Sequence, residues 1–334
     1  MVDSHRQRLR VLAASGLGHG SFLIRNSVAP ATQRKYRAAV AAFTNWAEAE
    51  GFDAVTDSDL DLLLVDYAHD LFMKGIAFSR YSTAVCGISW LRPDLRHSLP
   101  RAAAALRGWR RLHVTVSHPP LTWELACAIG VRMVTDGYWR HGVAAIIAFD
   151  CLLRVGELCA LKREDVLDSR DLRVSYEHKG MLLRLAHTKT GSNKSVEVLD
   201  TSAIALMRSL VTSTKAGGRL FPFTAADFRA RLHATCVSLG LSPRYVPHSL
   251  RHDGAIRYFH VLHMAIADVM YRGRWAAHKS AVTYLQSLVA LSSTMAVPEA
   301  LGAFAVRIAS DLINAFAIAR RKAATTAASP TTAD

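Results

Sequence analysis

The stretch PHSLRHDGAIRYFH, which begins at Pro247, carries an imidazole and a guanidinium three residues apart, at His248 and Arg251. Proline at the start of a predicted helix leaves free backbone N–H groups there, and such groups favour an anion. Arg251 heads a stripe of apolar residues with helical spacing, so its side chain should face the interior and need a partner. A metal site would require more ligands than this stretch offers, and a hydrophobic core would use neither residue. The stretch therefore predicts an anion-binding site.

Two further stretches offer cationic side chains. The segment LLRVGEL places Arg154 and Glu157 three residues apart, on one face of a predicted helix, and we expect Glu157 to support the arginine. The segment HTKTGSNK places Lys189 beside a turn that joins two predicted strands, and Lys194 follows the same turn. We expect Lys189 to act in the site, with Lys194 as its rival.

The segment RGRWAAHKSAVTYLQ places Trp275 nine residues before Tyr284. Two arginines, a histidine, a lysine and a tyrosine together suit the attack of a tyrosine hydroxyl on a phosphodiester. The arginines would hold the non-bridging oxygens and stabilise the negative charge of the transition state. A tyrosine hydroxyl has a pKa of ~10, so a histidine that accepts its proton and a lysine that protonates the leaving 5′-oxygen would both help. This chemistry requires no metal and no other cofactor.

Each of these residues, taken alone, has a commoner structural explanation. An isolated Arg154 would more often be a surface or helix-end arginine, and an isolated Lys189 a solvated hairpin residue. Trp275 and Tyr284 are surrounded by apolar residues and would more often belong to a core. We expect a functional site because all of them occur in one chain, in one order.

The residues that carry a family resemblance are, in chain order, Arg154, Lys189, His248, Arg251, Trp275 and Tyr284. They resemble the tyrosine recombinase (phage integrase) family, whose members carry Arg, Lys, His-x-x-Arg, His or Trp, and Tyr in this order. The segment SVAPATQRKYRAAVAAFTNWAEAEG resembles the first helix of the family's core-binding domain, so the likeness spans roughly 26–290. Many members have His where this chain has Trp275, which implies an indole N–H donor instead of a proton-transfer group.

The resemblance implies a site-specific recombinase that cuts and rejoins double-stranded DNA through a 3′-phosphotyrosine intermediate, without a cofactor. It also implies a homo-tetramer on two DNA sites and an intracellular, DNA-associated protein. Two other functions remain open: a type IB topoisomerase, which relaxes DNA with similar residues, and a DNA-binding protein derived from a recombinase that no longer cuts. The RGRW segment and the helical N-terminal region favour a recombinase over the first, and the intact Tyr284 with both arginines favours it over the second.

The elements that must position these residues follow from the spacing of apolar residues. Residues 26–114 show four helical segments, and residues 121–290 are mostly helical with three alternating segments, DLRVSYEHK, MLLRLAHTK and KSVEVLD. We therefore expect a mainly α fold, with a helical N-terminal core-binding domain and a mostly helical α+β catalytic domain that holds a small antiparallel sheet. The remaining boundaries are a flexible basic leader at 1–25, a linker at 115–120, a C-terminal helix at 291–321 and a disordered tail at 322–334. The resemblance implies that the C-terminal helix docks on a neighbouring protomer.

The positive charge is spread over the whole chain. The net charge is +14, with 15 Lys and Arg against 10 Asp and Glu in residues 1–118, and 26 against 17 in the rest. Two basic parts suggest a polyanion held from two sides. The apolar stretch LGAFAVRIASDLINAFAIA has helical spacing and charged residues, so we expect an amphipathic helix and no membrane span. The residues expected to contact DNA outside the reacting group are Arg101, Arg107, Arg110, Arg111 and Lys279.

Overall fold

The structure of the protein is a computed structural model that describes residues 22–112, 120–169, 171, 173, 180–188, 191–275 and 297–328. It consists of two compact units, Met1–Val116 and Ser117–Asp334. Most of the predicted leader and linker, and the last six residues of the predicted tail, lie outside the described residues.

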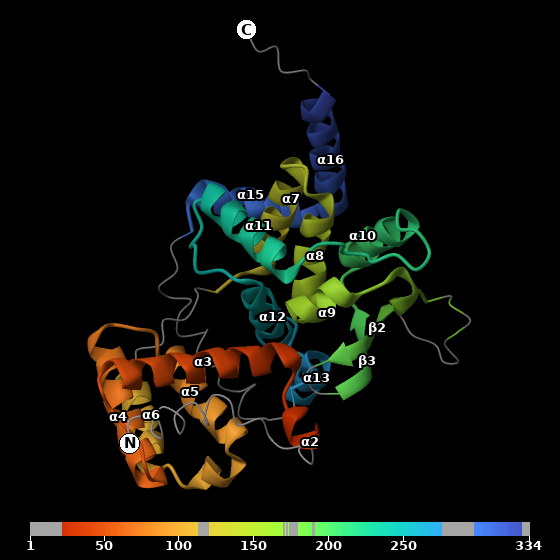
Figure 1. Cartoon of the computed structure of the whole chain (residues 1–334). Coiled ribbons are helices and arrows are strands. Elements are labelled where there is room, and N and C mark those ends of the chain that lie inside the picture. Colours follow the sequence, from red (N-terminus) through yellow and green to blue (C-terminus); the bar gives the residue numbers. More distant parts are fainter. Residues whose placement is uncertain are drawn as a thin grey trace. The chain divides into compact units, whose positions relative to one another are not determined.

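In its described part, the N-terminal unit consists of helices and the turns that join them (Figure 1). Its elements are α2 (Phe22–Arg25), α3 (Pro30–Ala49), α4 (Asp57–Met73), α5 (Phe78–Leu91), a 3-10 helix (Pro93–His97) and α6 (Pro100–Leu112). Because α2 is helical and Trp90 Nε1 donates a hydrogen bond to the Ile24 carbonyl at 3.3 Å, the expectation of a flexible leader up to residue 25 was wrong for its last four residues.

Helix α6 is fixed to the rest of the N-terminal unit through its first turn. The buried Asp61 carboxylate of α4 accepts hydrogen bonds from the backbone N–H groups of Arg101 and Ala102, at 2.9 and 2.8 Å. These bonds satisfy N–H groups that a helix start leaves without partners. Trp109 is buried and packs edge-on against Phe72. The four arginines of this helix are all exposed: Arg101, Arg107, Arg110 and Arg111.

The C-terminal unit surrounds one small sheet with helices (Figure 1). The sheet has the order β1-β2-β3 with antiparallel neighbours, and Leu183 pairs with Val196 across the hairpin. The strands are β1 (Val166–Leu167), β2 (Met181–Thr188) and β3 (Gly191–Val198). The helices are α7 (Trp123–Thr135), α8 (Trp139–Asp150), α9 (Val155–Ala160), a 3-10 helix (Arg163–Asp165), α10 (Thr201–Thr212), α11 (Ala225–Ser238), α12 (Pro247–Ile256), a π-helix (Arg257–Val261), α13 (Ile266–Gly273), α15 (Glu299–Ser310) and α16 (Leu312–Ala328).

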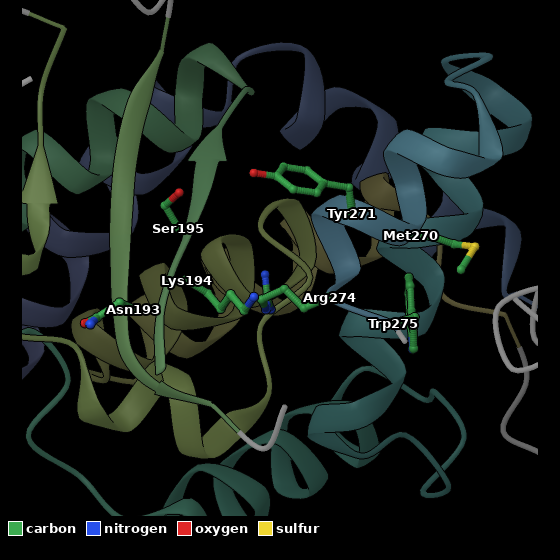
Figure 2. Close-up of a pocket in the computed structure, with 7 residues that line it drawn as sticks. All are labelled: Asn193, Lys194, Ser195, Met270, Tyr271, Arg274 and Trp275. Atoms are coloured by element: carbon green, nitrogen blue, oxygen red, sulfur yellow. The ribbon is translucent and has the colours of Figure 1, made fainter. Parts of the chain in front are cut away.

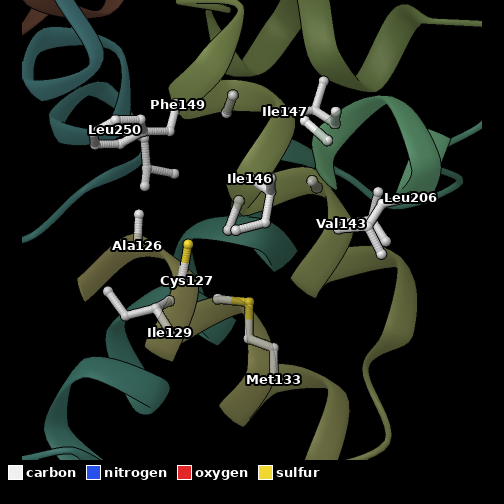
Figure 3. Packing of buried hydrophobic residues seen from close by; sticks show 14 of the residues in the cluster. Ala126, Cys127, Ile129, Met133, Val143, Ile146, Ile147, Phe149, Leu206 and Leu250 are labelled. Atoms are coloured by element: carbon white, nitrogen blue, oxygen red, sulfur yellow. The ribbon is translucent and has the colours of Figure 1, made fainter. Parts of the chain in front are cut away.

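Helices α7 and α8 form the centre of the core of this unit. They come close because glycines face each other: a Cβ on Gly142 would lie 2.5 Å from the Gly130 carbonyl oxygen. Figure 3 shows apolar side chains of both helices meeting with residues of α10 and α12. The labelled residues are Ala126, Cys127, Ile129, Met133, Val143, Ile146, Ile147, Phe149, Leu206 and Leu250. The predicted fold class, mostly helical with a small antiparallel sheet, is confirmed.

Three expectations about single elements were wrong or fall outside the described residues. The first predicted strand, DLRVSYEHK, is mostly outside them, and the strand that pairs with β2 lies earlier, at Val166–Leu167. The C-terminal helix is interrupted: Asp311 separates α15 from α16, because its carboxylate accepts from the Asn314 backbone N–H at 3.4 Å and so starts a new helix. Helix α16 continues to Ala328, because KAATTAA is rich in alanine, so the tail is not disordered from residue 322.

None of the described helices is by itself long and apolar enough to cross a membrane, whereas α15 and α16, bent by 106°, pass that test of length and composition as a pair.

Candidate active site

The Glu157 carboxylate is the centre of a buried cluster of charges. Arg154 Nη1 donates to Oε1 at 2.7 Å, and Arg274 Nη2 donates to Oε2 at 2.9 Å. Arg251 Nη1 lies 3.9 Å from Oε2. Burial raises the pKa of Glu157, but Arg274 and Arg154 together lower it by more, so the pKa lies below its ordinary value and the group is ionised. Three guanidiniums share one carboxylate, which leaves two positive charges in excess.

Arg154 precedes helix α9 instead of lying within it. It is the N-cap residue, and its backbone N–H donates at 2.9 Å to Oε2 of Glu157, the third residue of the helix, whose side chain accepts this bond as in a capping box. The expectation that both residues lie on one helical face was wrong for this reason. Glu157 therefore holds both the backbone and the side chain of Arg154, and that side chain keeps 24% of its surface exposed.

Arg251 of α12 is a fully buried arginine, with 0% of its surface exposed. Its Nη1 atom donates to the carbonyl of Leu152, which lies just after helix α8. Its Nη2 atom donates to the carbonyl of Gly273, the last residue of helix α13. Carbonyls at helix C-termini carry partial negative charge and compensate a buried cation. The Trp275 ring lies 4.8 Å from Arg251 Cζ, so it packs on the guanidinium and limits its movement.

Two residues of the cluster adopt a left-handed backbone that normally favours glycine. Leu152 has φ 50° and Arg274 has φ 55°, each just past the end of a helix. A left-handed conformation costs roughly 1–2 kcal/mol for a residue with a side chain. At Leu152 it directs the carbonyl that accepts from Arg251 and from Arg274 Nη2, the latter at 2.8 Å. The strain is therefore located at the groups that hold the arginines.

Gly254 allows α12 to approach α8 closely enough for Arg251 to reach Leu152. A Cβ at this position would meet the Phe149 carbonyl oxygen well inside van der Waals contact. That oxygen belongs to the backbone of α8 and cannot turn away as a side chain can. The position of Arg251 thus depends on a glycine one helical turn further along α12.

A second buried cluster ties α8, the end of β3 and α13 together. Arg272 Nη2 lies 3.2 Å from Asp150 Oδ2, and the Tyr258 hydroxyl donates to Asp150 Oδ1 at 2.7 Å. Arg272 Nη1 also donates to the Glu197 carbonyl at 2.6 Å. Burial, with Asp150 next, raises the pKa of Tyr258 well above its ordinary value, so this tyrosine is a structural hydrogen-bond donor. Sequence reasoning missed Asp150, although a carboxylate inside the apolar run AAIIAFDCLL was a signal.

Residues of β3 and of the end of α13 line an open pocket of about 410 Å³ (Figure 2). Lys194, exposed on β3, and the buried Arg274 both line it and point toward each other across it. Tyr271 and Trp275 contribute aromatic rings. The lining residues in the described part of the chain include no carboxylate, so the pocket favours an anion.

Helix α12 presents His248 in its first turn, where the side chain is exposed and its ring centroid lies 3.9 Å from that of His252. The structure thus brings together Arg154, Glu157, Arg251 and Trp275 of the predicted site, and adds Arg274, which sequence reasoning missed. Lys189, Lys279 and Tyr284 lie outside the described residues. Within the described chain, no group of three or more His, Cys, Asp or Glu residues could hold a metal ion.

A comparison with known proteins finds a family that matches part of this chain. Residues 133–290 match the model of the phage integrase family. These residues form a phage integrase family domain. The predicted resemblance is confirmed, and with it the class of enzyme, a tyrosine recombinase. The matched range contains Arg154, Lys189, the α12 residues, Trp275 and Tyr284.

Solved structures of two integrases share the fold. The Tn1549 transposon integrase in complex with transposon right end DNA is similar with a TM-score of 0.62 and 14% identity, over 83% of this chain and 94% of that chain. A lambda integrase dimer bound to a COC′ core site has a TM-score of 0.54 and 15% identity, over 84% and 93% of the two chains. At these identities the likeness is one of fold. No curated protein matches the sequence.

Proposed function

We propose that this protein is a site-specific recombinase, which cuts and rejoins double-stranded DNA through a 3′-phosphotyrosine intermediate. The observation that carries the proposal is the buried cluster in which three guanidiniums share one carboxylate. A phosphodiester carries one negative charge and gains a second when an oxygen nucleophile adds to phosphorus. A site with two excess positive charges suits that transition state better than its ground state, which is the condition for catalysis.

The reaction would use the predicted residues in the following roles. The Tyr284 hydroxyl oxygen forms a bond to phosphorus while the bond from phosphorus to the 5′-oxygen breaks. His248 accepts the phenolic proton, and the hairpin lysine gives a proton to the leaving 5′-oxygen. Arg154 and Arg251 hold the non-bridging oxygens. Rejoining is the reverse reaction, in which a 5′-hydroxyl attacks the phosphotyrosine, so no cofactor is consumed.

Double-stranded DNA is the proposed partner, and the protein would act where that DNA lies inside the cell. The exposed arginines of α6 and the basic charge of both units support this partner. The similar Tn1549 and lambda integrases were solved in complexes with DNA, which agrees with it. We extend the proposal to a homo-tetramer on two DNA sites, which would exchange strands in pairs.

Covalent capture on nicked DNA tests the proposal. A nick beside the scissile phosphate lets the cut end diffuse away, so the phosphotyrosine adduct accumulates. Wild-type protein should give a DNA-linked band, and Tyr284→Phe should bind the same DNA without forming one. Supercoil relaxation without pairing of two sites would favour the topoisomerase, and tight binding with no adduct from wild type would favour the non-cutting protein.

Cleavage of a sulfur-substituted substrate can show which of the two hairpin lysines protonates the leaving 5′-oxygen. Lys189→Ala should lower the cleavage rate by roughly 10²–10⁴-fold, because the 5′-oxygen then leaves without a proton. A substrate with sulfur in the 5′-bridging position needs no proton on leaving, so it should restore the rate. Lys194→Ala is the matched control and should cleave both substrates at about the wild-type rate. The reverse pattern would assign the role to Lys194, which lines the pocket beside Arg274.

The arginines of α6 should contribute to the salt dependence of DNA binding. Each neutralised phosphate contributes about −0.9 to the slope of log affinity against log salt. Replacing Arg107, Arg110 and Arg111 by alanine should therefore flatten the slope by up to about 2.7, three times that value. Cleavage at low salt with saturating DNA should survive, because these residues belong to the other unit. An unchanged slope would show that this surface does not meet DNA.

A further inference from the structure

Arg274 is the member of the cluster that the proposed reaction does not use. Its Nη2 atom donates to two groups at once, the Glu157 carboxylate at 2.9 Å and the Leu152 carbonyl at 2.8 Å. Its Nη1 atom donates to the Arg272 carbonyl at 2.7 Å, which fixes the plane of the guanidinium. The side chain is 4% exposed. One nitrogen atom thus contacts two acceptors that belong to different elements.

Those two acceptors are the anchors of the two catalytic arginines. Glu157 holds the guanidinium and the backbone N–H of Arg154, at 2.7 and 2.9 Å. The Leu152 carbonyl holds Nη1 of Arg251. The two arginines come from separate elements, the start of α9 and the second turn of α12, and no described hydrogen bond joins them directly. Arg274, just past the end of α13, is the link between their anchors.

Two destabilising features of Arg274 argue against a purely structural role. Its left-handed backbone, φ 55°, is the conformation that helix ends usually give to glycine. Its Nε atom is buried and has no hydrogen-bond partner in the described part of the chain, which is a further destabilising feature. Glycine would relieve both features and could still end the helix. An arginine retained under these conditions points to a role in function.

We propose that Arg274 is a positioning residue for the cleavage reaction: by holding Glu157 and the Leu152 carbonyl with one guanidinium, it sets the distance between Arg154 and Arg251. This inference rests on the proposed function. A planar guanidinium suits the task, because its fork reaches Glu157, Leu152 and the Arg272 carbonyl together, whereas a lysine ammonium is a single point of contact. Without it, Arg154 and Arg251 would be the charges that face Glu157 among the residues that the structure describes, and the two arginines would move independently.

The test uses three variants of the full chain. Arg274→Gly removes the link and relieves the backbone, so it should fold; Arg274→Lys keeps the charge without the fork. His263→Gly is the matched control, because His263 is exposed and has nearly the same left-handed φ, 53°, in the same unit. At saturating nicked DNA, adduct formation by Arg274→Gly should be slower by about 10²-fold, the usual effect of a misplacement near 1 Å. Arg274→Lys should lie between this variant and wild type, and His263→Gly should equal wild type.

A pH profile separates positioning from loss of stability. Among the residues described, the charges that face Glu157 are Arg154, Arg251 and Arg274, so removing Arg274 should raise the pKa of Glu157 toward or above its ordinary value. A carboxylate with a raised pKa is protonated, and so loses its charge, at a higher pH. The ratio of the wild-type to the Arg274→Gly rate should therefore increase as the pH falls, because any pH effect common to both proteins cancels in the ratio. A variant that was merely less stable would show a constant ratio per folded molecule.

Inorganic phosphate provides a readout that does not depend on recombination. Phosphate should raise the melting temperature of wild type and of His263→Gly more than that of Arg274→Gly, because two positioned arginines bind it better. If wild type forms no adduct but this difference appears, the proposed function fails and the positioning role stands. If wild type and Arg274→Gly form the adduct equally fast, the positioning role is overturned and the function stands. If the glycine variant does not fold, the same comparison is made with Arg274→Lys.

Discussion

Replacing Arg251 by methionine is expected to slow covalent adduct formation at saturating DNA by about 10²–10³-fold, the usual effect of removing one group that stabilises transition-state charge. Arg251 is fully buried, donates to the Leu152 and Gly273 carbonyls, packs on Trp275 and lies 3.9 Å from Glu157 Oε2. Because Arg154 and Arg274 share the same carboxylate, the cluster keeps an excess of positive charge for a substrate phosphate. Methionine fills a similar volume without the charge. DNA affinity should change little, because many other cations contribute to it.

Arg208→Met is the matched control for this prediction. Arg208 lies in the same unit and makes a two-bond contact with Asp168 at 2.7 Å, but both side chains are partly exposed to solvent. Its loss should leave the adduct rate unchanged, since exposed ion pairs contribute little. Single-turnover cleavage of nicked DNA measures both variants. Equal rates for wild type and Arg251→Met would place the reacting phosphate away from the Glu157 cluster.

Replacing Gly254 by alanine is expected to destabilise the C-terminal unit by about 3 kcal/mol, the upper end of the usual range for overpacking. The added Cβ would collide with the Phe149 carbonyl oxygen, so α12 and α8 must separate. For a unit of this size, that loss corresponds to a fall in melting temperature of roughly 6–12 °C. Arg251 would move with α12, so the adduct rate per folded molecule should fall as well.

Gly302→Ala is the control, because Gly302 lies in helix α15 and an added Cβ there would have nothing within 4 Å. This change should stabilise the unit slightly, by about 0.5–1 kcal/mol, as alanine favours a helix over glycine. Thermal unfolding followed by circular dichroism checks both. A melting temperature for Gly254→Ala within a degree of wild type would mean that α12 does not cross α8 as closely as described.

Much of the fold could be predicted from the sequence, because apolar residues recur with helical spacing along most of the chain. The exceptions have physical causes. Strand β1 spans only Val166–Leu167, too short to show alternation. The break at Asp311 is invisible to spacing, because apolar residues continue in register through it, and it depends on one side chain that caps α16.

The candidate site, like the fold, could be predicted from the sequence only in part. Arg154, Glu157, Arg251 and Trp275 could be predicted from residue type and order, and the structure places them together. Arg274 could not, because its role depends on two left-handed residues that direct it and the Leu152 carbonyl to one point. Spacing in a sequence carries no information on such conformations when neither residue is glycine.

The most direct test of the central claim is to identify the tyrosine that becomes linked to DNA. Trypsin should release residues 280–307 as one peptide that contains Tyr284 as its single tyrosine, and residues 258–272 as another that contains Tyr258 and Tyr271. After nuclease treatment of the trapped adduct, mass spectrometry should find the nucleotide mass on the 280–307 peptide, at Tyr284. A nucleotide on the 258–272 peptide, where exposed Tyr271 lines the cationic pocket, or on a residue other than tyrosine, would contradict the account.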